Sequence, residues 1–331
     1  MSGPALITGG SGVVGRALVQ RLVADGRHVV ALGRSDASRR ILMDLGADPV
    51  EGDVLDEGSV ERAARGCETV FHVAGVNAMC LRDPRPMFRT NVDGSVNVIR
   101  AAAAAGVGRV VHTSSASALG EAHGTVGRAD SPHRGWYLSD YERSKHLAER
   151  RVFETAAELG VDVVAVNPAS VQGPGRATGS ARLLLDVVNG RLPLLVDTSI
   201  SVVDVADCTQ GHLRAESRGV PGERYVLSGG SLTTREAVAV LRRVWGLPER
   251  VRFVPAFVAT AGGAAFGAGA RLLGRDAPIC PEAVRTLLHG HRYDGSRATR
   301  ELGLAYTPFE DTIRRTLEWC AERGLVPPAR V

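Results

Sequence analysis

The sequence predicts an α/β protein in which helices cover both faces of a parallel sheet and a smaller, mostly helical region follows. Three observations lead to this doubly wound fold class. Short β-branched runs alternate with Ala-rich stretches of helical period through the first half of the 331 residues. These runs are nearly continuous in apolar residues, as strands buried on both faces are. A glycine-rich turn directly follows the first run, which is typical of open sheets that bind a ligand at one edge.

Seven runs are predicted as strands because apolar residues dominate each one and Gly or charged residues bound it. They are Ala5–Thr8, His28–Leu32, Pro49–Glu51, Val70–Val73, Val110–Thr113, Val163–Val166 and Tyr225–Leu227. Helices are expected between the first six strands, at Val14–Ala24, Ser59–Ala64, Ser95–Ala105 and Ser139–Leu159. After Pro168 the alternation loosens, and from Leu232 onward the chain is predicted to be mostly helical.

Composition excludes several classes of protein. Hydrophobic residues make up 44% and charged residues 23%, which excludes a disordered or fibrous chain. The net charge of +4 comes without a Lys/Arg block, so neither nucleic acid nor a membrane is expected as a partner. The stretch before Ala5 lacks an export signal, and we expect a cytoplasmic protein.

Five scattered cysteines without CxxC spacing are predicted to be reduced thiols, with neither a disulfide framework nor a zinc site: Cys67, Cys80, Cys208, Cys280 and Cys320.

One long uncharged stretch, Phe253 to Ala270, needs a separate interpretation. It consists mainly of Ala and Gly, contains Pro255, and has neither Leu nor Ile, so it is a poor membrane span. We predict a buried or pocket-lining helix here. An interfacial membrane contact is the alternative.

The glycine-rich turn after the first strand carries the first chemistry. Gly10, Gly12 and Gly15 satisfy GxGxxG, and Gly9, Gly12 and Gly15 equally satisfy TGxxGxxG. Either motif allows a tight turn, close backbone approach and amide donors at a helix N-terminus, which suit the pyrophosphate of a dinucleotide. A glycine turn without ligand is the alternative. The expected cofactor contacts are Gly9, Gly10, Ser11, Gly12, Val13, Val14 and Gly15.

The end of the second strand bears on the choice of cofactor. Arg34 stands where an acidic residue would favour NAD, and a guanidinium suits the 2′-phosphate of NADP. The expected cofactor is therefore NADP, with NAD possible because Asp36 follows and Arg34 can equally be a solvated loop charge. Asp53 and Val54 end the third strand, where a carboxylate can accept from the adenine amino group. An exposed loop carboxylate is the competing interpretation of Asp53.

The chain contains 39 arginines and one lysine, Lys145. Only an ammonium is a compact charge whose pKa permits proton relay, so a solitary lysine suggests a task that arginine cannot perform. Tyr141 lies four residues earlier, on the same helix face. We expect Lys145 to lower the pKa of the Tyr141 phenol toward neutrality and to reach the ribose hydroxyls of the cofactor. A chance surface lysine is the alternative.

Other polar residues are weaker candidates. Ser114 and Ser115 end the fifth strand, where a hydroxyl can bond a substrate oxygen or merely satisfy local backbone. His289 and His291 form HxH without a carboxylate or Cys at ligand spacing, so loop histidines and no metal are expected. His72 and His112 lie within strands and are predicted to be core residues.

Taken together, the motifs resemble one family. TGGSGVVG, GDV, VFHVAG, NVDGSVNV, TSSAS, YERSK and NPASVQGPG occur in the order found in extended short-chain dehydrogenases/reductases of the NAD(P)-dependent epimerase/dehydratase superfamily. The resemblance covers nearly the whole chain. It implies a Rossmann fold and a catalytic set of Ser115, Tyr141 and Lys145. It further implies that Asn91 is structural and that the cofactor is lined by Ala74, Gly75, Thr113, Pro168 and Val171, together with Tyr141 and Lys145.

The same resemblance suggests a division of the chain. Residues 1–170 with about 201–228 are expected to form the dinucleotide-binding domain, and residues 171–200 and 229–331 the substrate-binding region. A homodimer is a family expectation. Residues 202–207 and 222–229 are similar to dihydroflavonol reductases, 3β-hydroxysteroid dehydrogenases and hopanoid-associated reductase-like proteins.

Three functions remain open at this point. The first is an NAD(P)-dependent oxidoreductase that interconverts a ketone and a secondary alcohol on a fairly apolar small molecule. The second is a cofactor-retaining epimerase or dehydratase acting on a sugar nucleotide or a related substrate. It is less favoured because residues 194–201 lack the usual diphosphate-binding Arg, although Arg176, Arg182 or Arg191 can substitute. The third is a redox-sensing regulator that binds a dinucleotide without turnover. Tyr141 and Lys145 argue against it, because binding alone needs no proton donor.

Overall fold

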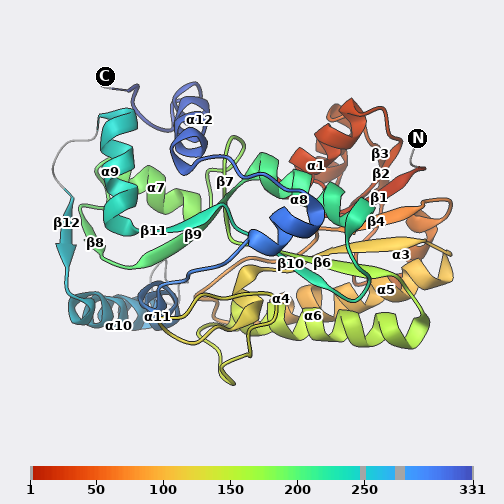
Figure 1. Ribbon diagram of the computed structural model, residues 1–331, viewed down its shortest axis with the longest axis horizontal. Helices are drawn as coiled ribbons and strands as arrows, with labels where there is room; N and C mark the ends of the chain where they lie inside the picture. Colours follow the sequence, from red (N-terminus) through yellow and green to blue (C-terminus); the bar gives the residue numbers. More distant parts are fainter. Residues whose placement is uncertain (1–2, 247–250, 273–279, 330–331) are drawn as a thin grey trace.

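A seven-stranded parallel sheet forms the centre of the protein (Figure 1). The structure is a computed structural model that describes residues 3–246, 251–272 and 280–329. The strand order is β10-β6-β5-β4-β1-β2-β3, and all neighbouring strands run parallel. Strand β1 lies between β2 and β4, with Ala5 opposite both Val29 and Thr69. The α/β fold class predicted from the sequence is confirmed.

All seven predicted strands are present, and their ends differ from the prediction by at most two residues. Strands β1 and β4 are buried at every position, which explains why their sequences are nearly continuous in apolar residues. The strands are β1 (Ala5–Thr8), β2 (Val29–Gly33), β3 (Asp48–Glu51), β4 (Thr69–His72), β5 (Arg109–Thr113), β6 (Val163–Pro168) and β10 (Arg224–Leu227).

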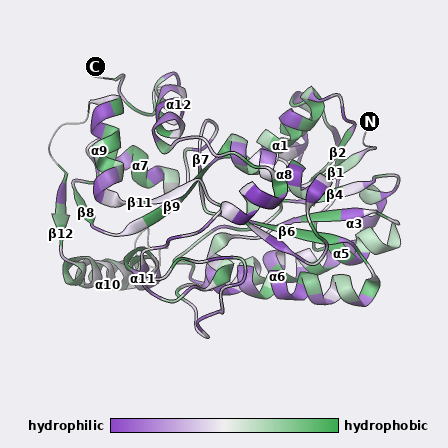
Figure 2. Ribbon diagram, in the orientation of Figure 1, coloured by the Kyte–Doolittle hydropathy of each residue, from purple (hydrophilic) through white to green (hydrophobic). Residues whose placement is uncertain are grey.

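Helices cover both faces of this sheet and create two separate apolar cores. One face carries α1 (Val13–Ala24), α2 (Asp36–Asp44) and α8 (Val205–Arg218), and the other carries α3 (Glu57–Ala64), α5 (Gly94–Ala104) and α6 (Asp140–Leu159). Figure 2 shows hydrophilic and hydrophobic residues alternating along α6, which buries one side against the sheet. Ser139 caps α6 by accepting from the N–H of Glu142. The prediction missed α2, whose sequence is highly charged but begins with a capping box of Ser35 and Ser38.

The rest of the chain builds a smaller region beside the carboxyl ends of the strands (Figure 1). It holds a three-stranded sheet of β7 (Ser170–Gln172), β9 (Ser199–Asp204) and β11 (Gly230–Thr233), and a two-stranded sheet of β8 (Leu194–Val196) and β12 (Arg252–Val254). Its longer helices are α7 (Ser180–Val188), α9 (Thr234–Trp245), α10 (Ala256–Leu272), α11 (Pro281–His289) and α12 (Phe309–Ala321).

The second region is mostly helical, as expected, but its five short strands were not predicted. Four short helical turns complete the described chain: α4 (Arg85–Phe88), η1 (Arg89–Asp93), η2 (Ala116–Leu119) and η3 (Ala298–Leu302). The division into a dinucleotide-binding domain and a substrate-binding region stays a prediction. Residues 1–2, 247–250, 273–279 and 330–331 of that division lie outside the described residues.

Helix α10 differs from its prediction. The uncharged stretch does form a helix, but the helix is not buried: the exposed fractions of Phe257 and Phe266 are 72% and 52%. The absence of charge identified an apolar helix, but it could not show whether other elements pack on it. Among the described helices, none combines the length and hydropathy needed to span a membrane.

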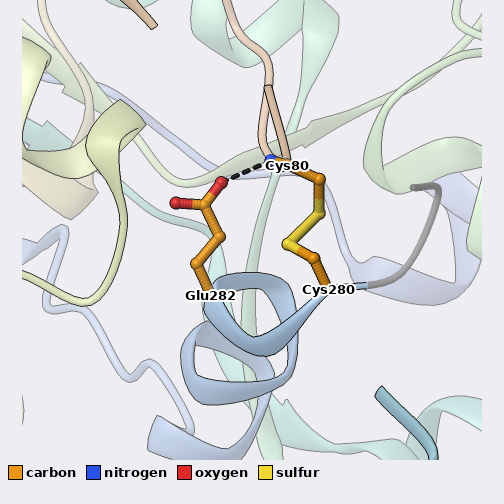
Figure 3. A group of neighbouring side chains, drawn as sticks. All are labelled: Cys80, Cys280 and Glu282. Atoms are coloured by element: carbon orange, nitrogen blue, oxygen red, sulfur yellow. Dashed lines mark hydrogen bonds between the residues drawn. A yellow bond between two sulfur atoms is a disulfide. The ribbon is translucent and has the colours of Figure 1, made fainter. Parts of the chain in front are cut away.

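The cysteines also differ from their prediction. Cys80, in the loop after β4, forms a disulfide with Cys280 at the start of α11, 200 residues away (Figure 3). Cys67, Cys208 and Cys320 are free thiols, as expected, and all three are buried. The prediction of reduced thiols is wrong for Cys80 and Cys280. Sequence spacing tests only local pairing motifs, whereas this bridge depends on two loops that meet in space.

Glu282 reinforces the same junction. One oxygen of its carboxylate accepts a hydrogen bond from the N–H of Cys80, and the other accepts from the N–H of Asp140 at 3.2 Å (Figure 3). Arg285, one turn later, donates to the carbonyl of Leu138 at 3.0 Å. Helix α11 therefore holds both the loop after β4 and the first residues of α6.

Candidate active site

The glycine turn between β1 and α1 brings the backbone of two loops into close contact. Gly9 has φ +71°, and a Cβ there would lie 2.5 Å from the backbone nitrogen of Ala74. A Cβ on Gly15 would lie 2.2 Å from the carbonyl oxygen of Gly9. A Cβ on Gly10 would meet the flexible end of Leu42 first, at 2.7 Å. Of the two motifs, the geometry therefore favours TGxxGxxG, which places a required glycine at position 9.

The start of α1 fits the pyrophosphate of a dinucleotide. Gly12 precedes the helix without any side-chain cap, and the first turn of the helix contains no acidic residue. The first amides of an α-helix have no partner within the helix, and the helix dipole is positive at this end. The backbone N–H groups of Val13, Val14 and Gly15 are thus suited to an anion. Ser11 uses its carbonyl to accept from Arg16 at 2.7 Å.

The loop after β4 lies against the catalytic candidate Lys145. A Cβ placed on Gly75 would lie 3.7 Å from the Lys145 Nζ and 3.3 Å from the Asn91 Oδ1. Asn91 Oδ1 accepts from the N–H of Val76 at 2.7 Å, while its Nδ2 donates to the Val76 carbonyl at 3.0 Å and to Ser144 Oγ at 2.9 Å. Asn91 therefore ties this loop to α6, in agreement with its expected structural place.

The residues expected near the adenosine lie at the ends of β2 and β3. The Arg34 side chain is 75% exposed, and its Nη1 lies 3.8 Å from the Asp53 Oδ2. Asp53 Oδ1 accepts from the N–H of Leu55 at 3.0 Å. Arg39, by contrast, pairs with the carboxylates of Asp36 and Glu51. Val54 is buried, and its carbonyl accepts from Asn97 at 3.1 Å.

Ser115, Tyr141 and Lys145 meet at the carboxyl end of β5. Lys145 is only 5% exposed, and its Nζ donates to the carbonyl of Thr113 at 2.8 Å. The Ser115 hydroxyl lies near enough to the phenol of Tyr141 to lower the pKa of that phenol, and its Oγ lies 2.9 Å from Ser117 Oγ. The solitary lysine is therefore buried beside the loop after β4, which excludes the chance surface lysine.

A buried network that the sequence analysis missed lies behind these groups. Burial lowers the pKa of Lys145 to about 8, and the carboxylate of Glu149, one turn along α6, opposes that shift. Glu149 Oε1 accepts from Arg224 at 2.8 Å, and its Oε2 accepts from Asn167 Nδ2 at 2.6 Å. Asn167 also donates to the carbonyl of Ser115 at 3.0 Å. The i,i+4 spacing of Lys145 and Glu149 was the signal that could have revealed this charge.

The electrostatics of Tyr141 correct one prediction. Burial raises the pKa of the phenol above its usual value, while the hydrogen bond from Ser115 and the charge of Arg176 lower it. The expectation that Lys145 lowers this pKa toward neutrality is wrong for the structure, because the ammonium is bonded to the carbonyl of Thr113 and the cation acting on the phenol is Arg176. Arg176 follows β7, and burial lowers the pKa of its own guanidinium.

The remaining candidates surround this centre. Thr113 turns its Oγ1 to His212 Nε2 at 2.8 Å, so its carbonyl rather than its hydroxyl faces Lys145. Pro168 ends β6, and Val171 is buried in β7. The expected core histidines are confirmed as buried, with His72 bonded to Thr8 at 2.7 Å and stacked on His112.

Comparison with known proteins now decides the family. Residues 5–228 match the NAD dependent epimerase/dehydratase family. The chain belongs to this family. It is 32% identical to a Synechocystis sp. protein provisionally named dihydroflavonol 4-reductase, over 97% of this chain and 95% of that protein. It is 31% identical to a 2-alkyl-3-oxoalkanoate reductase of Stenotrophomonas maltophilia, with coverages of 94% and 97%.

A solved structure supports the same family at the level of the fold. DesIV, a dTDP-glucose 4,6-dehydratase from Streptomyces venezuelae with NAD bound, superposes with a TM-score of 0.79 at 25% identity, covering 98% of this chain and 99% of that one. The protein is therefore an NAD(P)-dependent enzyme of the extended short-chain dehydrogenase/reductase type, and the resemblance noted from its motifs is confirmed.

Replacing Lys145 by Met is expected to stabilise the protein without cofactor. At pH 7 the folded chain holds a buried ammonium whose pKa is about 8 instead of 10.5, so removing it should raise the free energy of unfolding by about 3 kcal/mol. Between pH 8 and 10.5 the unfolded chain binds more protons than the folded chain, so the free energy of unfolding of the wild type rises with pH. The stability gained by Lys145→Met should therefore shrink across the same window. Chemical denaturation at several pH values measures this.

Arg150→Met is the matched control, because Arg150 lies exposed on the same helix in an ion pair with Glu154. The change in the free energy of unfolding caused by Arg150→Met should be small and independent of pH. A Lys145→Met protein that is less stable than wild type at pH 7, or equally changed at every pH, would show that burial of the ammonium does not cost stability.

Proposed function

We propose that the protein is an NADPH-dependent reductase that converts a ketone on a fairly apolar small molecule to a secondary alcohol. The observation that carries this proposal is that Ser115 lies beside the phenol of Tyr141, with Lys145 buried next to the loop of Gly75. A proton donor and a second hydroxyl at the carboxyl edge of a parallel sheet are what carbonyl reduction requires of the protein.

Each residue has a distinct part in this proposal. The bound dinucleotide supplies the hydride. Tyr141 donates its proton to the carbonyl oxygen, and Ser115 donates a hydrogen bond to that oxygen as negative charge develops there. Lys145, whose Nζ is bonded to the carbonyl of Thr113 and lies near Gly75, binds the ribose hydroxyls and returns a proton to Tyr141 in this proposal. Arg176 favours the phenolate that remains after proton transfer.

Two observations support an apolar substrate. Strand β8 and the start of β9, residues 194–201, contain no basic side chain that could bind a diphosphate. The two relatives named above carry the names of reductases of a flavonoid and of an alkyl-oxoalkanoate. The cytoplasmic location, the homodimer and the absence of a membrane contact stay predictions.

Tyr141→Phe tests the proposed reaction. The variant should lower kcat/KM for ketone reduction by about 10² to 10⁴-fold, which is the usual contribution of a positioned acid, and should leave NADPH affinity nearly unchanged. A panel of apolar ketones followed at the NADPH absorbance measures the rate. Tyr137→Phe is the control, because its ring packs on His133 and His146 one turn before Tyr141.

The outcome also separates this function from the alternative. Stoichiometric oxidation of NADPH by a ketone supports the reductase. NAD that copurifies tightly and shows no net turnover with any ketone, together with activity on a sugar nucleotide, would instead identify a cofactor-retaining epimerase or dehydratase.

We further propose that Arg34 binds the 2′-phosphate of NADP. Its side chain is exposed at the end of β2 and pairs only loosely with Asp53, whereas Arg39 is already engaged by two carboxylates. Arg34→Ser should weaken NADP⁺ binding about 10- to 100-fold, the value of a charge-assisted hydrogen bond, and leave NAD⁺ affinity nearly unchanged. Isothermal titration with each dinucleotide measures this.

Arg40→Ser removes the same charge six residues later, at an exposed position on α2, and should change neither affinity more than a few-fold. If Arg34→Ser leaves the ratio of the two affinities unchanged, the 2′-phosphate is bound elsewhere and the preference for NADP loses its support.

A further inference from the structure

Three side chains from two distant parts of the sequence come together outside the candidate active site. Glu121 follows the short helix η2, His289 ends α11, and His291 lies two residues further on. One ligand atom of each lies within 4.8 Å of the other two. Glu121 Oε1 is 2.7 Å from His291 Nδ1 and 3.6 Å from His289 Nε2. Sequence spacing shows only the HxH motif, because the carboxylate lies 168 residues away from it.

The charge of Glu121 is poorly compensated. The residue is 2% exposed, and burial of a carboxylate is costly unless a cation or several hydrogen bonds satisfy it. The nearby guanidinium of Arg134 is engaged by the carboxylate of Glu142 and donates only to the main-chain carbonyl of Glu121. Glu121 Oε2 and His291 Nε2 are buried without any hydrogen-bond partner. Among the described residues, the only ion-pair partners of the Glu121 carboxylate are therefore the imidazoles of His289 and His291, which carry a charge only when protonated.

We propose that Glu121, His289 and His291 bind one divalent transition-metal ion of the zinc type. Two imidazoles and one carboxylate form a ligand set that zinc accepts, with a fourth position left for water or another oxygen. The phenol of Tyr293 lies 2.9 Å from His291 Nδ1 and is close enough to complete the set. His289 Nε2 lies 3.2 Å from the carbonyl of Glu121, a contact that it exchanges for the metal.

The proposed ion is structural and takes no part in hydride transfer. It joins the end of α11 to the segment that follows Ser115, between the central sheet and the second region. Adjacent contacts already connect the same two segments, since Gly127 and Tyr293 form a β-bridge and His123 bonds the carbonyl of His289 at 3.0 Å. Metal binding is therefore expected to stabilise the packing of α11, and through it the loop and helix that α11 holds.

Metal analysis of the full-length protein without an affinity tag tests this proposal. After dialysis against Zn²⁺ and then against metal-free buffer, we expect about one zinc per chain. Titration with Co²⁺ should give the visible absorption of a four-coordinate ion, and the midpoint of thermal unfolding should rise with Zn²⁺ concentration. Glu121→Gln and His291→Asn should each weaken binding at least about 100-fold, the upper end of the loss caused by changes outside the ligand shell.

His28→Asn is the matched control. His28 forms an exposed histidine–carboxylate contact with Asp48, 2.6 Å apart, on the far edge of the sheet, and its loss should leave metal content unchanged. Equal zinc content in wild type and both ligand variants would overturn the proposal, because the ion would then bind elsewhere. Wild-type protein that retains no zinc and shows no Co²⁺ spectrum would also overturn it, and this measurement does not depend on whether the variants fold. Such a result would mean that a proton on an imidazole compensates Glu121.

Discussion

The buried ammonium of Lys145 is the constraint on which the rest of the site depends. Its Nζ is bonded to the carbonyl of Thr113, at the end of β5, and faces Gly75 in the loop after β4. A charge in this position lowers stability unless its surroundings compensate it. The fold provides only part of that compensation through Glu149, which lies one turn along α6 and is held by Arg224 and Asn167. The strands, the loop and the helix must all be in register for the ammonium to be placed there.

The same constraint explains why residues far from the cofactor matter for the site. Asn91 fixes the loop after β4 to α6, and Glu282 of α11 holds that loop and the start of α6 together. The disulfide of Cys80 and Cys280 adds a covalent connection at the same place. The position of the Gly75 loop relative to Tyr141 and Lys145 is therefore determined by a junction of three segments, and α6 alone does not determine it.

Local signals predicted most of the fold, whereas contacts between distant segments could not be predicted. The strands of the central sheet and α6 follow from apolar runs and periodicity, and the glycine turn follows from its spacing. In contrast, the disulfide, the pairing of Glu149 with Arg224 and the meeting of Glu121 with His289 depend on chain topology. Arg176 shows the same limit, because its charge acts on Tyr141 from a loop beyond β7. The exposure of Phe257 was missed since sequence alone does not show what packs on a helix.

Because the chain has a single lysine, the burial of its ammonium can be tested with one resonance. Protein labelled with ¹³C at lysine Cε gives one signal, whose chemical shift reports the titration of the Lys145 ammonium without assignment. In the protein without cofactor, we expect a midpoint near pH 8. A midpoint near the ordinary value of about 10.4 would show that the ammonium is solvated and not buried.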